Sequence, residues 1–279
     1  MKISLDCYPC YLRQTLEATR LTGADENKQY QILQNVLARL HHLKPIQTAP
    51  EVAGQIHAIV RQQTGVLDPY YQGKKASTRQ ALTLYSKLTT LIATAKDPLE
   101  TAVRLSIAGN IIDLGISPEY DLEATIERVL TQPFAINDFV AFKEALDKTK
   151  NVLYLADNAG ETVFDRLLIE TIGKPVIYVV KGGPILNDAT REDALEVGLD
   201  KITTLIDNGA TVPGTVLESC SEEFRDLFAK AELIIAKGQG NYESLSDTTA
   251  PVFFLLQAKC HVIAQYLGVP IKSIVLKKL

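Results

Sequence analysis

The spacing of apolar residues divides the chain into a helical first half and a second half in which two patterns alternate. Before residue 150, apolar positions recur three and four residues apart, as Ile32, Val36 and Leu40 do. This spacing is typical of amphipathic helices, and no convincing period-two pattern typical of a strand accompanies it. The predicted helices lie at 9–22, 27–43, 51–63, 76–95, 98–113, 122–131 and 138–148.

From residue 151 onward, short β-branched runs alternate with helical stretches. This alternation predicts a parallel sheet with helices on both faces. The expected fold class is therefore α/β, with an all-helical region (1–148) followed by a Rossmann-like three-layer α/β/α domain with a mostly parallel sheet (149–279). The two regions need not be independent folding units. The predicted strands lie at 152–156, 176–180, 202–206, 233–236 and 273–277.

Polar residues and glycines follow three of the predicted strands. In open α/β sheets, ligands bind outside the carboxyl ends of the strands, so these residues are expected to line one site. The residues are Asp157, Asn158, Gly160 and Glu161 after the first strand, Lys181, Gly182, Gly183, Asn187 and Asp188 after the second, and Lys237, Gly238, Gln239, Gly240 and Asn241 after the third of these strands.

Asp157 and Asn158 offer two adjacent oxygen side chains at a strand end. Such hard ligands suit Mg or Mn, and the N–H groups of a following helix favour an anion such as phosphate. The alternative is that both residues, and Asp188 likewise, simply cap helices. Two adjacent capping residues are redundant for one helix, which favours the metal-ligand interpretation.

Lys181 and Lys237 each leave a strand end before a glycine. A lone lysine is usually solvated, but the repetition favours a phosphate contact for at least one of them. Lys237 has the stronger claim, because glycines and Asn241 follow it directly. The chain lacks both the third glycine of the dinucleotide fingerprint and the P-loop pattern, so we expect no nucleotide cofactor.

Two polar residues, Asn110 and Asp113, interrupt a very apolar predicted helix. Polar groups in such a stretch cost free energy unless they are paired. They are therefore either hydrogen-bonded at a packing contact or placed at the active cleft, and the second interpretation is favoured slightly.

Cys7 and Cys10 have the spacing of half a zinc site or of a redox pair. Cys220 and Cys260 are far apart in the sequence, so they do not form the second close pair that a zinc site needs. No predicted strand precedes Cys7 and Cys10, as one does in the thioredoxin redox motif. Buried small residues at the start of a helix are the favoured interpretation.

Composition narrows the function classes. The net charge of −4 argues against nonspecific binding of nucleic acid, which needs a basic surface. No apolar run approaches the roughly 20 residues that span a bilayer, and the first residues lack a secretory apolar region. Four cysteines in 279 residues do not form a disulfide scaffold. The expected location is the cytoplasm.

An ordered set of motifs along nearly the whole chain resembles the damage-control phosphatase family, long catalogued as domain of unknown function eighty-nine, and in particular its archaeal and bacterial subfamily with paired N-terminal cysteines. The residues that carry the resemblance are Asp6, Cys7, Cys10, Gln14, Asp68, Pro69, Tyr70, Ala108, Gly109, Asn110, Asp113, Asp157, Asn158, Gly160, Glu161, Lys181, Gly182, Pro184, Asn187, Asp188, Lys237, Gly238, Gly240, Asn241, Tyr242, Lys259 and Cys260.

The resemblance implies hydrolysis of phosphate monoesters with a divalent metal: Mn, Co, Ni or Mg. It implies that Asp157, Asn158 and Asp188 are the metal ligands and catalytic residues, and that the turn around Gln239 to Glu243 and the amine of Lys259 hold the phosphate. Together with the strand-end pattern, it gives the predicted substrate-binding set: Asn110, Asp113, Glu161, Lys181, Lys237, Gly238, Gln239, Gly240, Asn241 and Lys259.

We therefore expect a metal-dependent phosphatase that acts on small phosphorylated metabolites, including damaged molecules and side products. Asp157 would be a ligand that also serves as nucleophile or base. The covalent route is disfavoured, because Ala159 stands where a dehalogenase-type phosphatase has a second Asp. Two alternatives remain: a metal-dependent phosphometabolite-binding protein without turnover, and a carboxyl methyltransferase, for which the usual S-adenosylmethionine fingerprint is missing.

Overall fold

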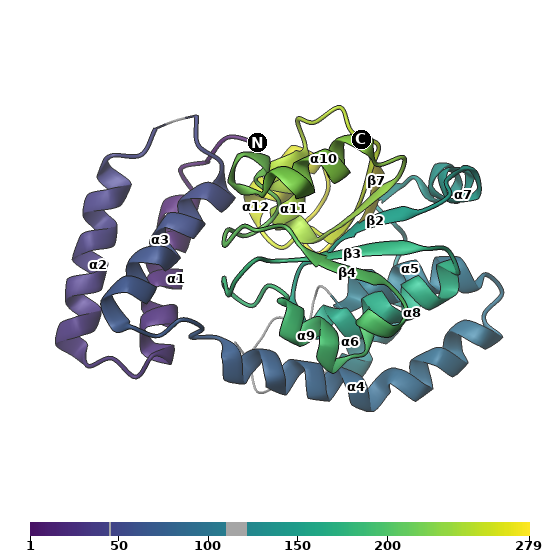
Figure 1. The fold of residues 1–279 in the computed structure, drawn as a ribbon, viewed down its shortest axis with the longest axis horizontal. Coiled ribbons are helices and arrows are strands. Elements are labelled where there is room, and N and C mark those ends of the chain that lie inside the picture. The colour runs from purple at the N-terminus through teal and green to yellow at the C-terminus, as the bar shows by residue number, and fades with distance from the viewer. Residues whose placement is uncertain (45, 110–121) are drawn as a thin grey trace.

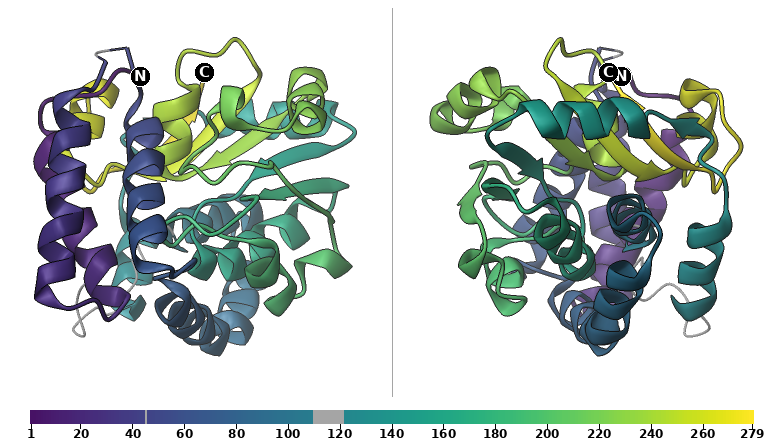
Figure 2. Two further views of the ribbon diagram at one scale, coloured as in Figure 1. Left: turned by 60° about the vertical axis from the view of Figure 1, so that its left-hand side comes forward. Right: turned by 90° about the vertical axis from the view of Figure 1, so that its right-hand side faces the viewer.

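A computed structural model describes residues 1–44, 46–109 and 122–279, and Figure 1 shows their arrangement. A central sheet lies between two layers of helices, and a group of three helices stands beside it. Figure 2 shows the same group from two other directions. The three helices are α1 (Cys7–Leu21), α2 (Glu26–His41) and α3 (Ala49–Thr64).

Local sequence signals set the limits of these three helices. The Asp25 side chain accepts a hydrogen bond from the backbone N–H of Lys28 at the start of α2. Thr48 and Glu51 form a reciprocal capping box at the start of α3, and Gly65 ends that helix in the left-handed conformation. The group has apolar clusters of its own, which include Val36 and Ile56 among other buried residues.

The next helices cover one face of the sheet. Helices α4 and α5 both pack against α8, and their apolar residues share one core cluster with the strands. Helices from before residue 148 therefore contribute to the core of the sheet. The predicted division into two domains at residue 148 stays a prediction. The helices are α4 (Tyr71–Thr94), α5 (Pro98–Gly109), α6 (Leu122–Thr131), α7 (Phe139–Lys148) and α8 (Thr162–Ile172).

In the described part of the chain, seven strands form one sheet in the order β1-β7-β6-β5-β2-β3-β4. Every neighbouring pair is parallel except β6 and β7, which are antiparallel. The mostly parallel three-layer α/β fold is thereby confirmed. The strands are β1 (Ile136–Asn137), β2 (Val152–Leu155), β3 (Val176–Val180), β4 (Thr204–Asp207), β5 (Ile234–Lys237), β6 (Val252–Gln257) and β7 (Ile274–Lys278).

Two strands were not predicted. Strand β6 (Val252–Gln257) is apolar at every position but its last, and such a run can be a buried helix as readily as a buried strand. Strand β1 has two residues, too few to show a period. The expectation of no strand before residue 150 was therefore wrong.

The remaining helices complete the two layers. Figure 1 shows α10, α11 and α12 on one face of the sheet and α4, α5, α8 and α9 on the other. Within the described ranges, no helix combines the length and apolar character that crossing a membrane requires. The remaining helices and short 3₁₀ turns are η1 (Ala159–Glu161), α9 (Arg191–Glu196), η2 (Leu199–Lys201), η3 (Leu217–Ser219), α10 (Glu222–Lys230), α11 (Gly238–Leu245) and α12 (His261–Leu267).

The α1–α3 group contacts loops that follow strands of the sheet. Arg61 in α3 donates a hydrogen bond to the carbonyl of Pro184 over 3.1 Å. On the same helix, Gly54 lies so close to Val212 that a Cβ would meet its methyl groups at 3.0 and 3.3 Å. Helix α3 therefore stands over the loops after β3 and β4, at the edge where a site is expected.

Candidate active site

The chain reverses its direction of travel across the sheet at β2. Strand β2 pairs with β3 on one side and with β5 on the other, and both pairs are parallel. The connections from the two carboxyl ends consequently diverge, which leaves the crevice where α/β proteins bind ligands. Asp157 lies just beyond the end of β2, and Lys237 and Gly238 mark the end of β5.

The backbone brings the three predicted metal ligands together. Asn158 and Asp188 form an isolated antiparallel bridge. Next to it, the N–H of Ala189 donates to the carbonyl of Asp157 over 2.7 Å, and the N–H of Ala159 donates to the carbonyl of Asn187 over 2.8 Å. Residues 30 positions apart in sequence are thus joined at one point of the crevice. Asp157, Asn158 and Asp188 are 8%, 6% and 3% exposed.

The two aspartates carry unfavourable charges. Burial and, after it, the nearby Asp188 carboxylate raise the pKa of Asp157 to about 6, although Lys259 and Lys181 oppose the rise. Burial likewise raises the pKa of Asp188, to about 6, and the main effect that opposes this rise is the positive charge of Lys181. Two buried carboxylates in one place could hold a cation, because a bound cation would relieve both effects.

The donor atoms fit a hard divalent ion. Oδ2 of Asp188 is buried and accepts no hydrogen bond from a described residue, although the Lys181 amine lies 3.4 Å away. The amide nitrogen of Asn158 donates to Glu161 over 2.7 Å, which leaves its oxygen for the crevice. The described residues hold no group of three or more His, Cys, Asp and Glu that could hold a metal. A cation here therefore depends on two carboxylates and one amide.

Glu161 supports Asn158 from behind. Its side chain is fully buried and accepts from Asn158 through one oxygen and from Lys237 through the other. Burial raises the pKa of Glu161 to about 7, and Lys237 opposes that rise. These two hydrogen bonds make Glu161 a support that orients the Asn158 amide, and its predicted substrate contact stays a prediction.

Lys237 lies below the crevice. Its amine donates to the carbonyl of Ser106 over 2.9 Å, to Glu161 over 2.9 Å and to Asp165 over 2.7 Å. An ammonium has three N–H bonds, and these three acceptors use all of them. The predicted contact between Lys237 and phosphate therefore does not fit this arrangement.

Asp165, which the sequence did not single out, is the centre of the buried layer that holds Lys237. Besides Lys237, it accepts hydrogen bonds from the hydroxyls of Tyr154 over 2.7 Å and Tyr178 over 2.8 Å. The two tyrosine rings stack at 5.3 Å. The available signal was a lone acid on the otherwise apolar face of a helix. This network fixes the floor of the crevice.

Lys181 and Lys259 are the lysines at the crevice. Lys181 is 4% exposed, donates to the carbonyl of Gly214 and lies beside Asp188. Lys259 is half-buried, follows the unpredicted strand β6 and acts electrostatically on Asp157. It lies between the end of β6 and the start of α12. Lys237 is thereby disfavoured as a phosphate ligand, and the predicted phosphate contacts of Lys181 and Lys259 stay predictions.

We expect Lys181→Met to lower kcat/KM by at least about fiftyfold at saturating metal, roughly 2.3 kcal/mol of transition-state stabilisation. Methionine keeps the length of the stem and removes the charge beside Asp188. Lys237→Met should instead lower the free energy of unfolding by about 3 kcal/mol, because Glu161 and Asp165 would lose their buried partner. Steady-state kinetics and urea unfolding separate the two roles. A kcat/KM for Lys181→Met within about threefold of wild type would contradict the assignment.

The start of α11 contributes space and hydrogen bonds. Gly238 has a φ of 75°, and a Cβ there would overlap the carboxylate of Asp157. Asn241 is fully buried, and its amide nitrogen donates to the carbonyls of Ala156 over 3.2 Å and Lys237 over 2.8 Å. These two residues position the ends of β2 and β5, whereas Gln239 and Gly240 are partly exposed. Substrate contacts for Gln239 and Gly240 stay predictions.

The paired cysteines have an unexpected neighbour. Cys7 and Cys10 lie in the first turn of α1, and Cys260 precedes α12. Burial is the main cause of the raised pKa of Cys7 and of Cys260, and the nearby thiols contribute: Cys260 and Cys10 raise the pKa of Cys7, and Cys10 raises that of Cys260. Cys260 is therefore less isolated than its place in the sequence suggested. Asn110 and Asp113 lie outside the described residues, so their predicted roles stay predictions.

Removal of metal should make stability depend on pH in a definite direction. Asp157 and Asp188 have their pKa raised from 3.8 to about 6 on folding, so the folded state holds protons that the unfolded state releases. Stability should then fall as pH rises from about 4 to about 6. We expect metal-free Asp188→Asn to match wild type at pH 4 and to exceed it by at least about 1 kcal/mol at pH 8. Urea unfolding with chelator would test this, and greater stability of wild type at pH 8 would contradict it.

Comparison with known proteins gives a consistent result. The sequence profile of the damage-control phosphatase ARMT1-like domain matches residues 3–275. A damage-control phosphatase of Pyrococcus horikoshii is 36% identical over 282 residues, which cover 97% of this chain and 96% of the relative. A damage-control phosphatase of Archaeoglobus fulgidus is 35% identical over 289 residues, 99% of both chains. The crystal structure of a DUF89 family protein from Pyrococcus horikoshii superimposes with a TM-score of 0.90 at 34% identity, over 100% of this chain and 99% of that one.

Proposed function

The chain belongs to the damage-control phosphatase ARMT1-like family, and we propose that it is a metal-dependent phosphatase that hydrolyses phosphate monoesters of small metabolites. The names of its relatives support phosphatase activity in general. The observation that carries the finer proposal is the convergence of Asp157, Asn158 and Asp188, where the buried Asp188 Oδ2 has the Lys181 amine at 3.4 Å and no closer hydrogen-bond donor among the described residues. The proposed metal is Mn, Co, Ni or Mg, since the donors are hard oxygens.

When bound at these three residues, the metal would supply Lewis-acid polarisation of the phosphoryl group. Lys181 and Lys259 bring positive charge to the same crevice, where it would offset charge on the phosphoryl oxygens in the transition state. Glu161 holds the Asn158 amide in orientation, and the Lys237–Asp165 network fixes Glu161. The residues around the reacting group are thus held by buried contacts before substrate arrives, as electrostatic stabilisation requires.

Asp157 is the candidate for moving a proton. Its carboxylate lies at the crevice and is ionised at neutral pH. It could accept the proton of an attacking water molecule. Direct attack by water is favoured over an aspartyl-phosphate, because Ala159 leaves no second acid to assist a covalent step.

The substrates proposed are small phosphorylated metabolites, including damaged molecules and side products, in the cytoplasm. The support is the family and a crevice with two lysines beside a carboxylate pair. A panel of phosphate esters that begins with p-nitrophenyl phosphate, assayed with Mn²⁺, Co²⁺, Ni²⁺ and Mg²⁺ after treatment with chelator, tests the proposal. We expect phosphate release only with added metal. Metal-dependent binding of phosphate esters without any release would instead indicate a phosphometabolite-binding protein.

A further inference from the structure

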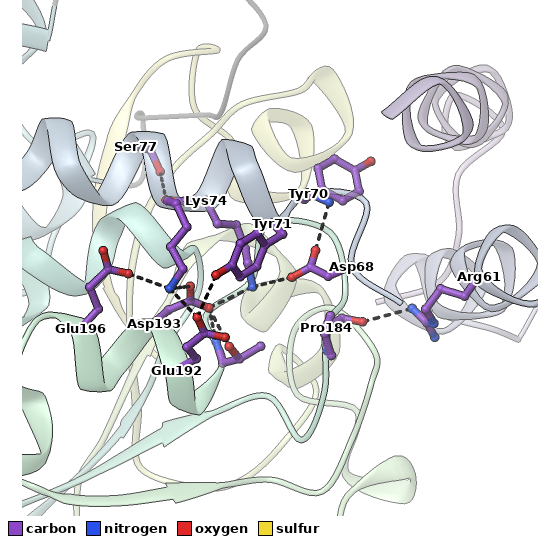
Figure 3. A network of polar contacts seen from close by, with 12 residues as sticks. Arg61, Asp68, Tyr70, Tyr71, Lys74, Ser77, Pro184, Glu192, Asp193 and Glu196 are labelled. Carbon is purple, nitrogen blue, oxygen red and sulfur yellow. Dashed lines mark hydrogen bonds and ion pairs between the residues drawn. The ribbon is translucent and has the colours of Figure 1, made fainter. Parts of the chain in front are cut away.

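A buried lysine outside the crevice connects the α4 helix to the segment that carries Asp188. Lys74 lies in the first turn of α4 and is 2% exposed. Its amine lies 3.0 Å from Oδ2 of Asp68 and 2.9 Å from Oδ2 of Asp193. Figure 3 shows both carboxylates directed at this amine, one from the segment before α4 and the other from α9. A buried ion pair contributes little net stability, so its geometric role is the more informative property.

Asp193 connects Lys74 to the segment that carries Asp188. Its Oδ2 also accepts hydrogen bonds from the N–H of Thr190 over 2.9 Å and from the Thr190 hydroxyl over 2.7 Å. Thr190 is two residues from Asp188, and between them Ala189 is bonded to Asp157 on one side and to Lys181 on the other. The position of the Asp193 carboxylate therefore fixes the segment on which Asp188 lies.

The same helix abuts the other ligand-bearing turn. A Cβ on Gly160 would meet Oγ of Ser77 at 2.7 Å and its Cβ at 3.1 Å, so the turn after Asn158 lies directly against α4. Ser77 is three residues after Lys74, on the same face of the helix. Helix α4 thus contacts the Asn158 turn through Ser77 and the Asp188 segment through Lys74, and its rigidity can set the distance between them.

We propose that Lys74 is a positioning residue for the metal site, which fixes Asp188 relative to Asn158 through Asp193. The inference rests on the proposed function, because it assigns Lys74 to the same metal site. Groups that orient metal ligands from the next layer typically change metal affinity about 10- to 100-fold when removed.

The neighbouring residue Lys75 provides a matched control. It joins the same two helices, through Glu192 over 2.9 Å and Glu196 over 2.7 Å. Its amine lies 4.0 Å from Oδ1 of Asp193, and among the described residues its ion pairs are with acids of α9, not with Thr190 or the turn after Asn158. Loss of Lys75 should weaken the packing of α4 on α9 without moving Asp188.

Calorimetric titration of Mn²⁺ into metal-free protein tests the proposal without an activity assay. We expect Lys74→Met to weaken the Mn²⁺ Kd at least about tenfold and Lys75→Met to leave it within about twofold, with folding of each variant checked by thermal unfolding. Asp193→Asn should also weaken the Kd at least about tenfold. The asparagine keeps an oxygen that can accept from Thr190 but loses the charge that pairs with Lys74. If Lys74→Met does not fold, the Mn²⁺ Kd of Asp193→Asn tests the proposal in its place.

An unchanged Mn²⁺ Kd in Lys74→Met, with a lower unfolding midpoint, would overturn the inference and leave Lys74 a purely structural residue. The same conclusion follows if Lys75→Met weakens Mn²⁺ binding as much as Lys74→Met does. Failure of wild type to bind Mn²⁺ at all would instead overturn the proposed function, and the inference with it. The two failures are therefore distinguishable in one experiment.

Discussion

Replacement of Asp157 by alanine should abolish detectable Mn²⁺ binding and lower kcat/KM by at least about a thousandfold, roughly 4 kcal/mol of transition-state stabilisation. Asp157 supplies one of the two carboxylates of the proposed metal site and is the candidate base. Its backbone carbonyl, which accepts from Ala189, is unaffected by the substitution. The bridge between Asn158 and Asp188 should therefore survive, and the loss would be chemical rather than structural.

Asp207 offers a matched control for this variant. It ends β4 at the same edge of the sheet, but it is exposed and its side chain accepts from the N–H of Gly209. Asp207→Asn preserves that hydrogen bond and should keep both Mn²⁺ affinity and kcat/KM within about twofold of wild type. Calorimetry and phosphate-release kinetics on the two variants give the comparison. Stoichiometric Mn²⁺ binding by Asp157→Ala would contradict the assignment of the ligands.

The layer architecture was predictable because buried parallel strands have short apolar sequences that alternate with helical patterns. The prediction failed where one sequence pattern is compatible with both a buried strand and a buried helix. Val252–Gln257 is apolar at nearly every position, since β6 lies in the middle of the sheet and is buried on both faces. Because β6 was not predicted, the sequence did not show that Lys259 follows a strand into the crevice.

The strand-end rule located the crevice but did not give the direction of each side chain. Side chains alternate between the faces of a strand. Lys237 ends β5 two residues after Ile235 and shares its face, so it points toward the helix that carries Asp165. Lys181 continues the alternation of β3 from Val179, which faces the opposite layer. Strand phase therefore explains why Lys237 lies in the buried layer with Asp165 and Lys181 lies beside Asp188.

The supports of the site were beyond sequence reasoning for a different reason. Lys74 and Asp193 are 119 residues apart, and each is one charged residue in an ordinary amphipathic helix. Nothing in the local pattern distinguishes such a pair from solvated charges. Only the packing of α4 on α9, which depends on the whole core, brings the two side chains together.

The last prediction concerns Gly238, which was expected to bind substrate and whose main role in the structure is to leave room for Asp157. A Cβ at this position would overlap the Asp157 carboxylate, and the φ of 75° also disfavours any other residue. We expect Gly238→Ala to displace that carboxylate, remove Mn²⁺ binding and lower kcat/KM by at least about a thousandfold. The backbone strain alone would cost about 1 kcal/mol of stability.

Gly173→Ala separates strain from displacement. Gly173 ends α8 with a φ of 64°, and nothing lies within 4 Å of a Cβ built there. Both alanine variants should therefore lose about 1 kcal/mol of stability from the left-handed backbone, and only Gly238→Ala should lose metal binding and activity. Urea unfolding, Mn²⁺ calorimetry and kinetics on the pair would show the difference. If Gly238→Ala keeps full Mn²⁺ affinity, metal binding does not require the Asp157 carboxylate to lie where the structure has it. The assignment of Asp157 as a metal ligand in this geometry would then be wrong.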